Sequence, residues 1–182
     1  MPLRRALRRS HEHRPVWLLD VDGVINTPHP GWGAAPHSEH VYPGGPQYMC
    51  WAPALIARIH ALHDTGSVDI RWCSTSCSDA DRLEALFGLP RLDRAWYDRL
   101  TSTAAAAAKL AAARDILDRG RPLIWTDDTE VPAFGPVHDE LTRGGRTLLI
   151  APSPRHGLQP DHLDAIEAFV ASVARTSTAH PS

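Results

Sequence analysis

The side chains with the clearest chemical potential are Asp20 and Asp22, at the end of the apolar stretch 16–21 and just before Gly23. Residues two apart in an extended chain project to the same side, so we expect these carboxylates to be neighbours where strand gives way to loop. Two carboxylates about 4 Å apart repel by roughly 4 kcal/mol at an effective dielectric of about 20. A shared proton, a basic side chain or a divalent cation could offset this repulsion. Gly23 lets the backbone turn sharply or approach a ligand closely. Our expectation for this pair is Mg²⁺ and a phosphate.

Two other predicted strands end in polar groups that suit the first pair. Ser74 and Thr75 follow the predicted strand 68–74, and Asp127 and Asp128 follow the predicted strand 121–126. An acidic pair after a strand can be only a turn or a helix cap, and Ser74 alone is more typical of a turn hydroxyl. Ligands of parallel α/β sheets bind outside the carboxyl ends of the strands, so the three groups together indicate a site.

The elements that must position these groups alternate between strand and helix. Predicted strands span 16–21, 68–74, 92–97, 121–126 and 146–151. Predicted helices span 51–63, 103–119 and 161–173. A further predicted helix is capped by residues 78–81 and ends at Phe87. This alternation predicts an α/β fold, a three-layer Rossmann-like parallel sheet of about five strands with helices on both faces and no separate cap domain.

The flanking segments differ in composition from this single domain, which we assign to residues 15–173. Residues 1–14 carry five arginines and are expected to form a disordered basic arm, either a solvated tail or a contact for RNA or DNA. Residues 174–182 are expected to be a disordered tail. Residues 27–50 are rich in Pro, Gly and His and are expected to form a loop insertion, either a flap over the site or a surface excursion.

Composition narrows the partners and the compartment. The formal net charge of −2 gives no bulk attraction to nucleic acid or acidic membranes. The three cysteines are too few for a disulfide scaffold and indicate a reducing compartment. No segment resembles a membrane span or the apolar part of a signal peptide, so we expect a cytoplasmic protein with no membrane partner.

At this point the motifs resemble those of the haloacid dehalogenase (HAD) superfamily of phosphohydrolases, over roughly residues 15–172. The first motif is Leu18–Val24, the second is Trp72–Thr75 and the fourth is Ile124–Asp128. Lys109 is the candidate for the third. The chain is similar to capless members of this superfamily, so the resemblance implies a HAD-like sheet with an open site.

The resemblance also implies roles for individual residues. Asp20 would attack phosphorus and Asp22 would serve as general acid and then general base. The Mg²⁺ ligands would be Asp20, Asp22 through its carbonyl, and one or both of Asp127 and Asp128. The phosphate would be bound by Ser74, Thr75, Lys109 and the backbone near Gly23.

Lys109 is the only lysine among 19 basic residues, and its position is the weakest part of the match. If its helix starts at Thr103, Lys109 lies six residues in, about 9 Å below the helix start. Helical side chains tilt toward the N-terminus, so the ammonium group could still reach the site. The alternatives are a solvent-facing lysine and Arg99 as a substitute cation.

The predicted function is a Mg²⁺-dependent phosphomonoesterase that forms an aspartyl-phosphate. A nucleic-acid end is the first substrate to try, and a phosphoprotein or a small phosphorylated metabolite stays open. The alternative is a catalytically weak or inactive HAD-fold module that binds or regulates, which the uncertain cation supports. A dehalogenase or phosphotransferase on the same scaffold is a third hypothesis. A dehalogenase needs no metal, so the Asp127–Asp128 pair counts against it.

Overall fold

A computed structural model describes residues 13–178 of the chain and contains a sheet of five parallel strands. Its strands are β1 (Val16–Leu19), β4 (Asp69–Trp72), β5 (Asp93–Arg94), β6 (Leu123–Thr126) and β7 (Thr147–Ile150). They lie in the order β5-β4-β1-β6-β7. The predicted α/β class and parallel sheet are therefore confirmed.

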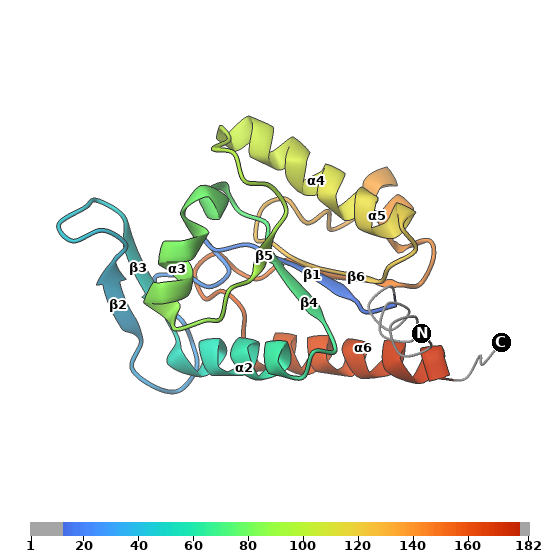
Figure 1. Cartoon of the computed structure of the whole chain (residues 1–182), viewed down its shortest axis with the longest axis horizontal. Coiled ribbons are helices and arrows are strands. Elements are labelled where there is room, and N and C mark those ends of the chain that lie inside the picture. The colour runs from blue at the N-terminus through green and yellow to red at the C-terminus, as the bar shows by residue number, and fades with distance from the viewer. Residues whose placement is uncertain (1–12, 179–182) are drawn as a thin grey trace, which may run out of the picture.

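Helices cover both faces of this sheet and make a three-layer sandwich (Figure 1). The helices are α2 (Pro53–Asp64), α3 (Ala80–Phe87), α4 (Ser102–Asp118), α5 (Pro136–Thr142) and α6 (Pro160–Thr178). One apolar cluster joins Trp17 and Leu19 to α2, α3 and α6, and a second joins Val16 and Leu18 to α4 and α5. Alternate residues of β1 thus face opposite layers, as the period of a strand requires.

The central strand β1 sets the position of the candidate site. Leu19 is paired with Thr126 of β6 on one side and with Trp72 of β4 on the other. Because these strands are parallel and in register, the residues that follow them, Asp20 and Asp127, leave the sheet side by side. The chain adds β4 and β5 on one side of β1, and β6 and β7 on the other. Asp20 and Asp127 therefore flank the point where the strand order reverses, the usual ligand-binding crevice of such sheets.

A buried side-chain hydrogen bond ties β1 to β6. Trp17 Nε1 donates to Thr126 Oγ1 at 3.0 Å, and neither residue is exposed to solvent. A buried indole N–H needs an acceptor, and Thr126 provides one across the strand pair. This contact fixes the relative position of the two strands that carry Asp20 and Asp127.

The insertion between β1 and α2 contains a hairpin rather than the predicted loop. Strands β2 (His37–His40) and β3 (Tyr48–Trp51) pair antiparallel. Met49 and Trp51 are buried, and the Trp51 ring meets the edge of Phe87 with centroids 5.1 Å apart. Because Trp51 belongs to this hairpin, α2 begins at Pro53, two residues later than predicted.

The ends of the described chain also differ from expectation. Helix α6 continues to Thr178, five residues past the predicted end at residue 173. The carbonyl of Arg14 accepts hydrogen bonds from the guanidinium of Arg121, so the domain already includes the last residue of the predicted arm. Residues 1–12 of the predicted arm and residues 179–182 of the predicted tail lie outside the described residues. Among the described helices, none has both the length and the hydropathy to cross a membrane.

Candidate active site

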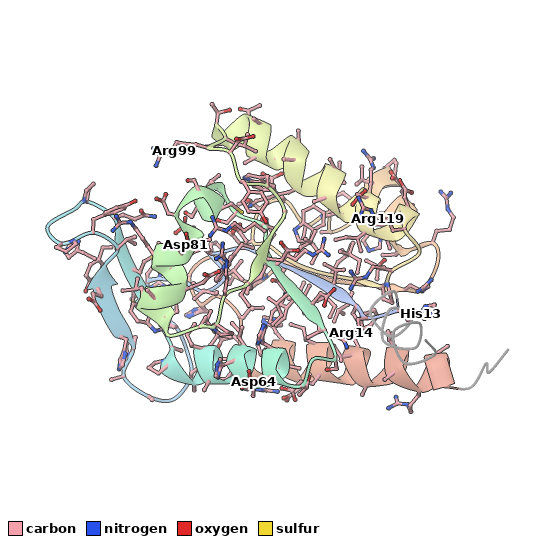
Figure 2. The ribbon with its side chains drawn as sticks, viewed as in Figure 1. His13, Arg14, Asp64, Asp81, Arg99 and Arg119 are labelled. Atoms are coloured by element: carbon pink, nitrogen blue, oxygen red, sulfur yellow. The ribbon has the colours of Figure 1, made fainter. Side chains whose placement is uncertain are left out.

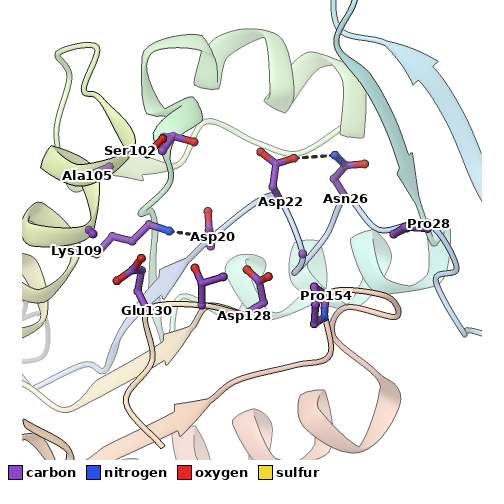
Figure 3. Close-up of a pocket in the computed structure, with 14 residues that line it drawn as sticks. Asp20, Asp22, Asn26, Pro28, Ser102, Ala105, Lys109, Asp128, Glu130 and Pro154 are labelled. Atoms are coloured by element: carbon purple, nitrogen blue, oxygen red, sulfur yellow. Dashed lines mark hydrogen bonds and ion pairs between the residues drawn. The ribbon is translucent and has the colours of Figure 1, made fainter.

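Asp20 lies directly after β1 and is almost fully buried, with 5% of its surface exposed. The backbone N–H of Val21 donates to its Oδ1 at 2.7 Å, and the ammonium group of Lys109 donates to its Oδ2 at 2.6 Å. Each carboxylate oxygen thus has a donor, and two charge-assisted or short hydrogen bonds fix the plane of the group. Figure 3 shows this carboxylate at the centre of the pocket.

Lys109 reaches the site from the third turn of α4. Helix α4 begins after Thr101, whose hydroxyl accepts from the backbone N–H of Ala104. The Lys109 side chain is buried, and its Nζ lies 2.6 Å from Asp20 Oδ2 and 2.6 Å from Asp127 Oδ2. The N-terminal tilt of helical side chains carries the ammonium group to the carboxyl ends of β1 and β6. The solvent-facing alternative is therefore wrong.

The substitute cation considered from the sequence, Arg99, lies elsewhere. Its side chain projects outward from the loop that precedes α4 (Figure 2) and is 80% exposed. Its guanidinium lies 3.6 Å from a carboxylate oxygen of Asp79, and Arg99 does not line the pocket around Asp20. Lys109 is the basic side chain that lines this pocket.

The charges of the site perturb one another. Burial, and then the charge of Asp127, raise the pKa of Asp20 to about 7, although Lys109 and the Ser74 hydroxyl act in the opposite direction. Burial alone would lower the pKa of Lys109. The charge of Asp20 and the hydrogen bonds to Asp127 and Asp20 outweigh it, so this pKa lies above its ordinary value. The ammonium group is therefore charged, and the carboxylates around it repel one another.

Asp127 and Asp128 follow β6 and face different surroundings. Asp127 is fully buried, and its Oδ1 accepts from the backbone N–H groups of Thr129 (3.1 Å) and Glu130 (2.8 Å). This turn aims Oδ2 of Asp127 at Lys109. Asp128 is partly exposed and lines the pocket. Burial, followed by the charge of Asp127, raises the pKa of Asp128.

Three carboxylates converge as a metal site would require. Asp20, Asp127 and Asp128 each offer an oxygen, and these oxygens all lie within 4.8 Å of one another. Oxygens this close could share one divalent cation, with water molecules or a substrate as further ligands. With Lys109, three carboxylates carry a formal charge of −2, which one divalent cation neutralises. An all-oxygen donor set suits a hard cation such as Mg²⁺.

Gly23 lies against this set and leaves no room for a side chain. A Cβ built on it would lie 2.3 Å from the carboxylate carbon of Asp128. Its φ of +72° is also in the left-handed region, which favours glycine. The glycine of the first motif is therefore required by the close approach of the two loops that follow β1 and β6.

The side chain of Asp22 is not part of the three-carboxylate cluster. Asp22 is exposed, lines the same pocket, and accepts a hydrogen bond from the side chain of Asn26 at 2.7 Å (Figure 3). The sequence-based expectation placed four aspartates at the metal, with Asp22 contributing its backbone carbonyl. The structure brings the carboxylates of the other three together, and the carboxylate of Asp22 faces the pocket beside Asn26.

Ser74 and Thr75, which were both expected to bind phosphate, lie in different surroundings. Ser74 is buried, and its hydroxyl accepts from the backbone N–H of Ser76 at 3.2 Å, where it caps the 3₁₀ helix η1 (Thr75–Asp79). Ser74 also contributes to the pKa of Asp20, as described above. Thr75 is exposed and lines the pocket. Of the two hydroxyl residues, Thr75 is therefore the one that a bound ligand would meet.

The pocket around these groups has a volume of about 390 Å³. Its lining includes residues that the sequence reasoning did not single out: Asn26, Pro28, Ser102, Ala105, Ala106, Thr129, Glu130 and Pro154. No residue of the hairpin 37–51 lines it, so in this structure the hairpin is not a flap over the site. The sequence does single out Asn26 in one respect: it is the only asparagine in the chain, and it follows Asp22 by four residues.

Comparisons of the chain with protein-family models, with curated proteins and with solved structures found no match.

Proposed function

We propose that this protein is a Mg²⁺-dependent phosphomonoesterase of the HAD type that works through an aspartyl-phosphate. One observation carries the proposal: Lys109 and the carboxylates of Asp20, Asp127 and Asp128 converge at the carboxyl edge of the sheet. Asp22 faces the same pocket. A nucleophile, a cation site, a fixed ammonium group and a second carboxylate are the parts that this chemistry needs.

The proposed reaction has two displacements at phosphorus. A carboxylate oxygen of Asp20 bonds to phosphorus while the bond from phosphorus to the ester oxygen breaks, and Asp22 gives that oxygen a proton. The alcohol leaves. Asp22, now a carboxylate, accepts a proton from a water molecule whose oxygen bonds to phosphorus. The bond between phosphorus and Asp20 then breaks, which releases inorganic phosphate and restores both side chains.

The pocket is strongly acidic for an enzyme that binds an anion. Its charged lining residues are Lys109 and the acidic side chains of Asp20, Asp22, Asp128 and Glu130. A bound Mg²⁺, held by Asp20, Asp127 and Asp128, would supply the positive charge that lets a phosphate approach. Without a cation, a phosphate dianion would meet a net negative surface.

The position of Lys109 supports an enzyme over a binding or regulatory module. That alternative rested on doubt about whether a cation stands beside the nucleophile. The ammonium group lies 2.6 Å from Asp20, and its contact with Asp127 leaves it in reach of both the nucleophile and the metal ligands. A phosphoryl oxygen next to Asp20 would share this charge, which stabilises the charge that develops in the transition state.

For the substrate, we propose a phosphate at an accessible end of a larger molecule, with nucleic-acid ends as the first class to examine. The pocket lining includes exposed residues, among them Thr75, Ser102 and Glu130, and the inserted hairpin does not cover it. An open pocket of this kind suits a substrate that brings its own cover. The fold alone does not choose among phosphorylated substrates.

The test is a phosphate-release screen with Mg²⁺ on nucleotides, oligonucleotides with 5′- or 3′-phosphate ends, sugar phosphates and phosphopeptides. We expect release from at least one class, loss of release in EDTA, and recovery when Mg²⁺ is restored. The variant Asp20→Asn should fold and release no phosphate. Full activity in Asp20→Asn would overturn the proposal. Binding of Mg²⁺ and phosphate mimics without turnover of any class would favour the regulatory module.

A further inference from the structure

Asn26 joins the carboxylate of Asp22 to the inserted hairpin. Its Nδ2 donates to Asp22 Oδ1 at 2.7 Å, and its Oδ1 accepts from the backbone N–H of Cys50 in β3 at 2.8 Å. Asn26 is the only asparagine in the chain, as Lys109 is the only lysine. Both of these side chains contact an aspartate of the first motif.

Chemistry fixes which way the Asn26 amide points. The backbone N–H of Cys50 can only donate, so it must face the amide oxygen of Asn26. The amide nitrogen then has to face Asp22, where it donates to Oδ1. A flipped amide would leave two donors facing each other at Cys50 and two acceptors facing each other at Asp22. The hydrogen bond from Cys50 therefore orients the Asn26 amide so that its nitrogen donates to Asp22.

The backbone of this segment is held as firmly as the side chain. The N–H of Asn26 donates to the carbonyl of Val21, and the carbonyl of Asn26 accepts from the N–H of Gly23, both at 2.9 Å. The N–H of Thr27 donates to the carbonyl of Cys50, also at 2.9 Å. The loop that carries Asp22 is thus closed on itself and attached to β3 at two adjacent points.

We propose that Asn26 is a positioning residue that holds Asp22 for proton transfer to and from the substrate, a role that rests on the proposed function. The amide N–H of Asn26 donates to Oδ1 of Asp22, and none of the described residues donates to Oδ2. Oδ2 is the oxygen that exchanges a proton with the leaving group and then with water. The hairpin serves this site by setting the Asn26 amide rather than by covering the pocket.

The informative variant is Asn26→Asp. Its carboxylate keeps an acceptor for the N–H of Cys50 but puts a second acceptor against Asp22, so the attachment to the hairpin survives and the donor is lost. Asn26→Ala removes both hydrogen bonds and serves as the second variant if Asn26→Asp does not fold. Tyr48→Ala, at an exposed ring of the same hairpin, is the control. Thermal unfolding establishes that each variant is folded.

The readout is kcat/KM for phenyl phosphate and for p-nitrophenyl phosphate, measured with Mg²⁺. Phenolate is the poorer leaving group and depends on a proton from Asp22, whereas p-nitrophenolate leaves with little help. We expect Asn26→Asp to lower kcat/KM for phenyl phosphate about tenfold more than for p-nitrophenyl phosphate. Asn26→Ala should change the ratio in the same direction, and Tyr48→Ala should leave it unchanged.

The outcomes separate the two proposals. Equal losses with both substrates in the Asn26 variants, or no loss, would overturn the positioning role and leave the phosphatase proposal standing. A wild-type protein that hydrolyses neither aryl phosphate and no member of the wider screen would overturn the proposed function, and the positioning role with it. A merely structural role for Asn26 would lower both rates together.

Discussion

Lys109 Nζ and Asp20 Oδ2 are separated by 2.6 Å, although the two residues are 89 positions apart in the chain. Both side chains are buried, and Lys109 contacts Asp127 at the same distance. The ammonium group therefore stands between the two strand ends at the centre of the sheet. It offsets part of the repulsion between carboxylates that would otherwise be buried side by side.

The substitution Lys109→Met is expected to harm both stability and activity. Removal of one partner from a buried charge pair leaves the other uncompensated, typically at about 3–5 kcal/mol. We expect a loss of this size in the free energy of urea unfolding at pH 8, and at least a hundredfold loss of phosphate release.

The control for this substitution is Arg114→Met on the same helix. Arg114 pairs with Glu140 at the surface, where both side chains are more than 40% exposed. Exposed pairs contribute about 0–1 kcal/mol, so this variant should unfold nearly as the wild type does. Equal stability losses in the two variants would contradict the central role of Lys109.

The position of Lys109 also shows where sequence reasoning stops. Asp20 and Asp127 could be placed together because parallel strands in one sheet end at one edge, whatever the length of the connections. A helical residue depends on where its helix begins, and each residue of error moves it by 1.5 Å and rotates it by about 100°. With the predicted start at Thr103, it stayed open whether the ammonium group of Lys109 reaches the site. In the structure, Thr101 caps α4.

The hairpin and α5 were missed for related reasons. All residues of β2 are exposed, so the strand has no alternation of apolar and polar positions to reveal it. Helix α5 has seven residues, fewer than two helical periods need, and only Leu141 of it is buried. The role of Asn26 depends on Cys50 of this hairpin, 24 residues away, and so could not be read from its neighbours.

The metal-free protein is expected to become less stable as the pH rises from about 4 to 7. The pKa of Asp20 is about 7 in the fold against 3.8 in the unfolded chain, so between these values only the folded state holds the proton. Folding stability falls with pH wherever the folded state binds more protons. Above pH 7 the loss from this group is at most on the order of 4 kcal/mol.

Thermal unfolding in EDTA at pH 5 and pH 8 measures this dependence. We expect Mg²⁺ to raise the unfolding temperature at pH 8 and to have little effect at pH 5, because a protonated Asp20 is a poor ligand. The Asp20→Asn variant lacks the titrating group and should show a flatter pH profile. An identical profile in wild type and Asp20→Asn would assign the titration to other groups.

Asp127 and Asp128 are expected to respond differently to replacement by asparagine. Asp128 lines the pocket and takes part in no ion pair with Lys109, so Asp128→Asn should weaken Mg²⁺ binding at least tenfold and leave unfolding in EDTA almost unchanged. In Asp127→Asn, the amide oxygen must still accept from the backbone of Thr129 and Glu130, which turns the amide N–H groups toward Lys109. Asp127→Asn should therefore lose stability in EDTA in addition to Mg²⁺ affinity. Calorimetric titration with Mg²⁺ and unfolding in EDTA distinguish the two effects.

The last prediction concerns the contact between the loops after β1 and β6. In Gly23→Ala the new methyl group would lie 2.3 Å from the carboxylate carbon of Asp128, so one of the two loops must move. The φ of +72° adds a backbone strain of about 1–2 kcal/mol. Gly120→Ala is a matched control, because Gly120 has a φ of +71° and no atom within 4 Å of its built Cβ. Both variants should lose similar stability from the backbone, but only Gly23→Ala should also weaken Mg²⁺ binding, by about tenfold, in a calorimetric titration. Equal Mg²⁺ affinity in the two variants would mean that the position of Asp128 against Gly23 has no part in holding the metal.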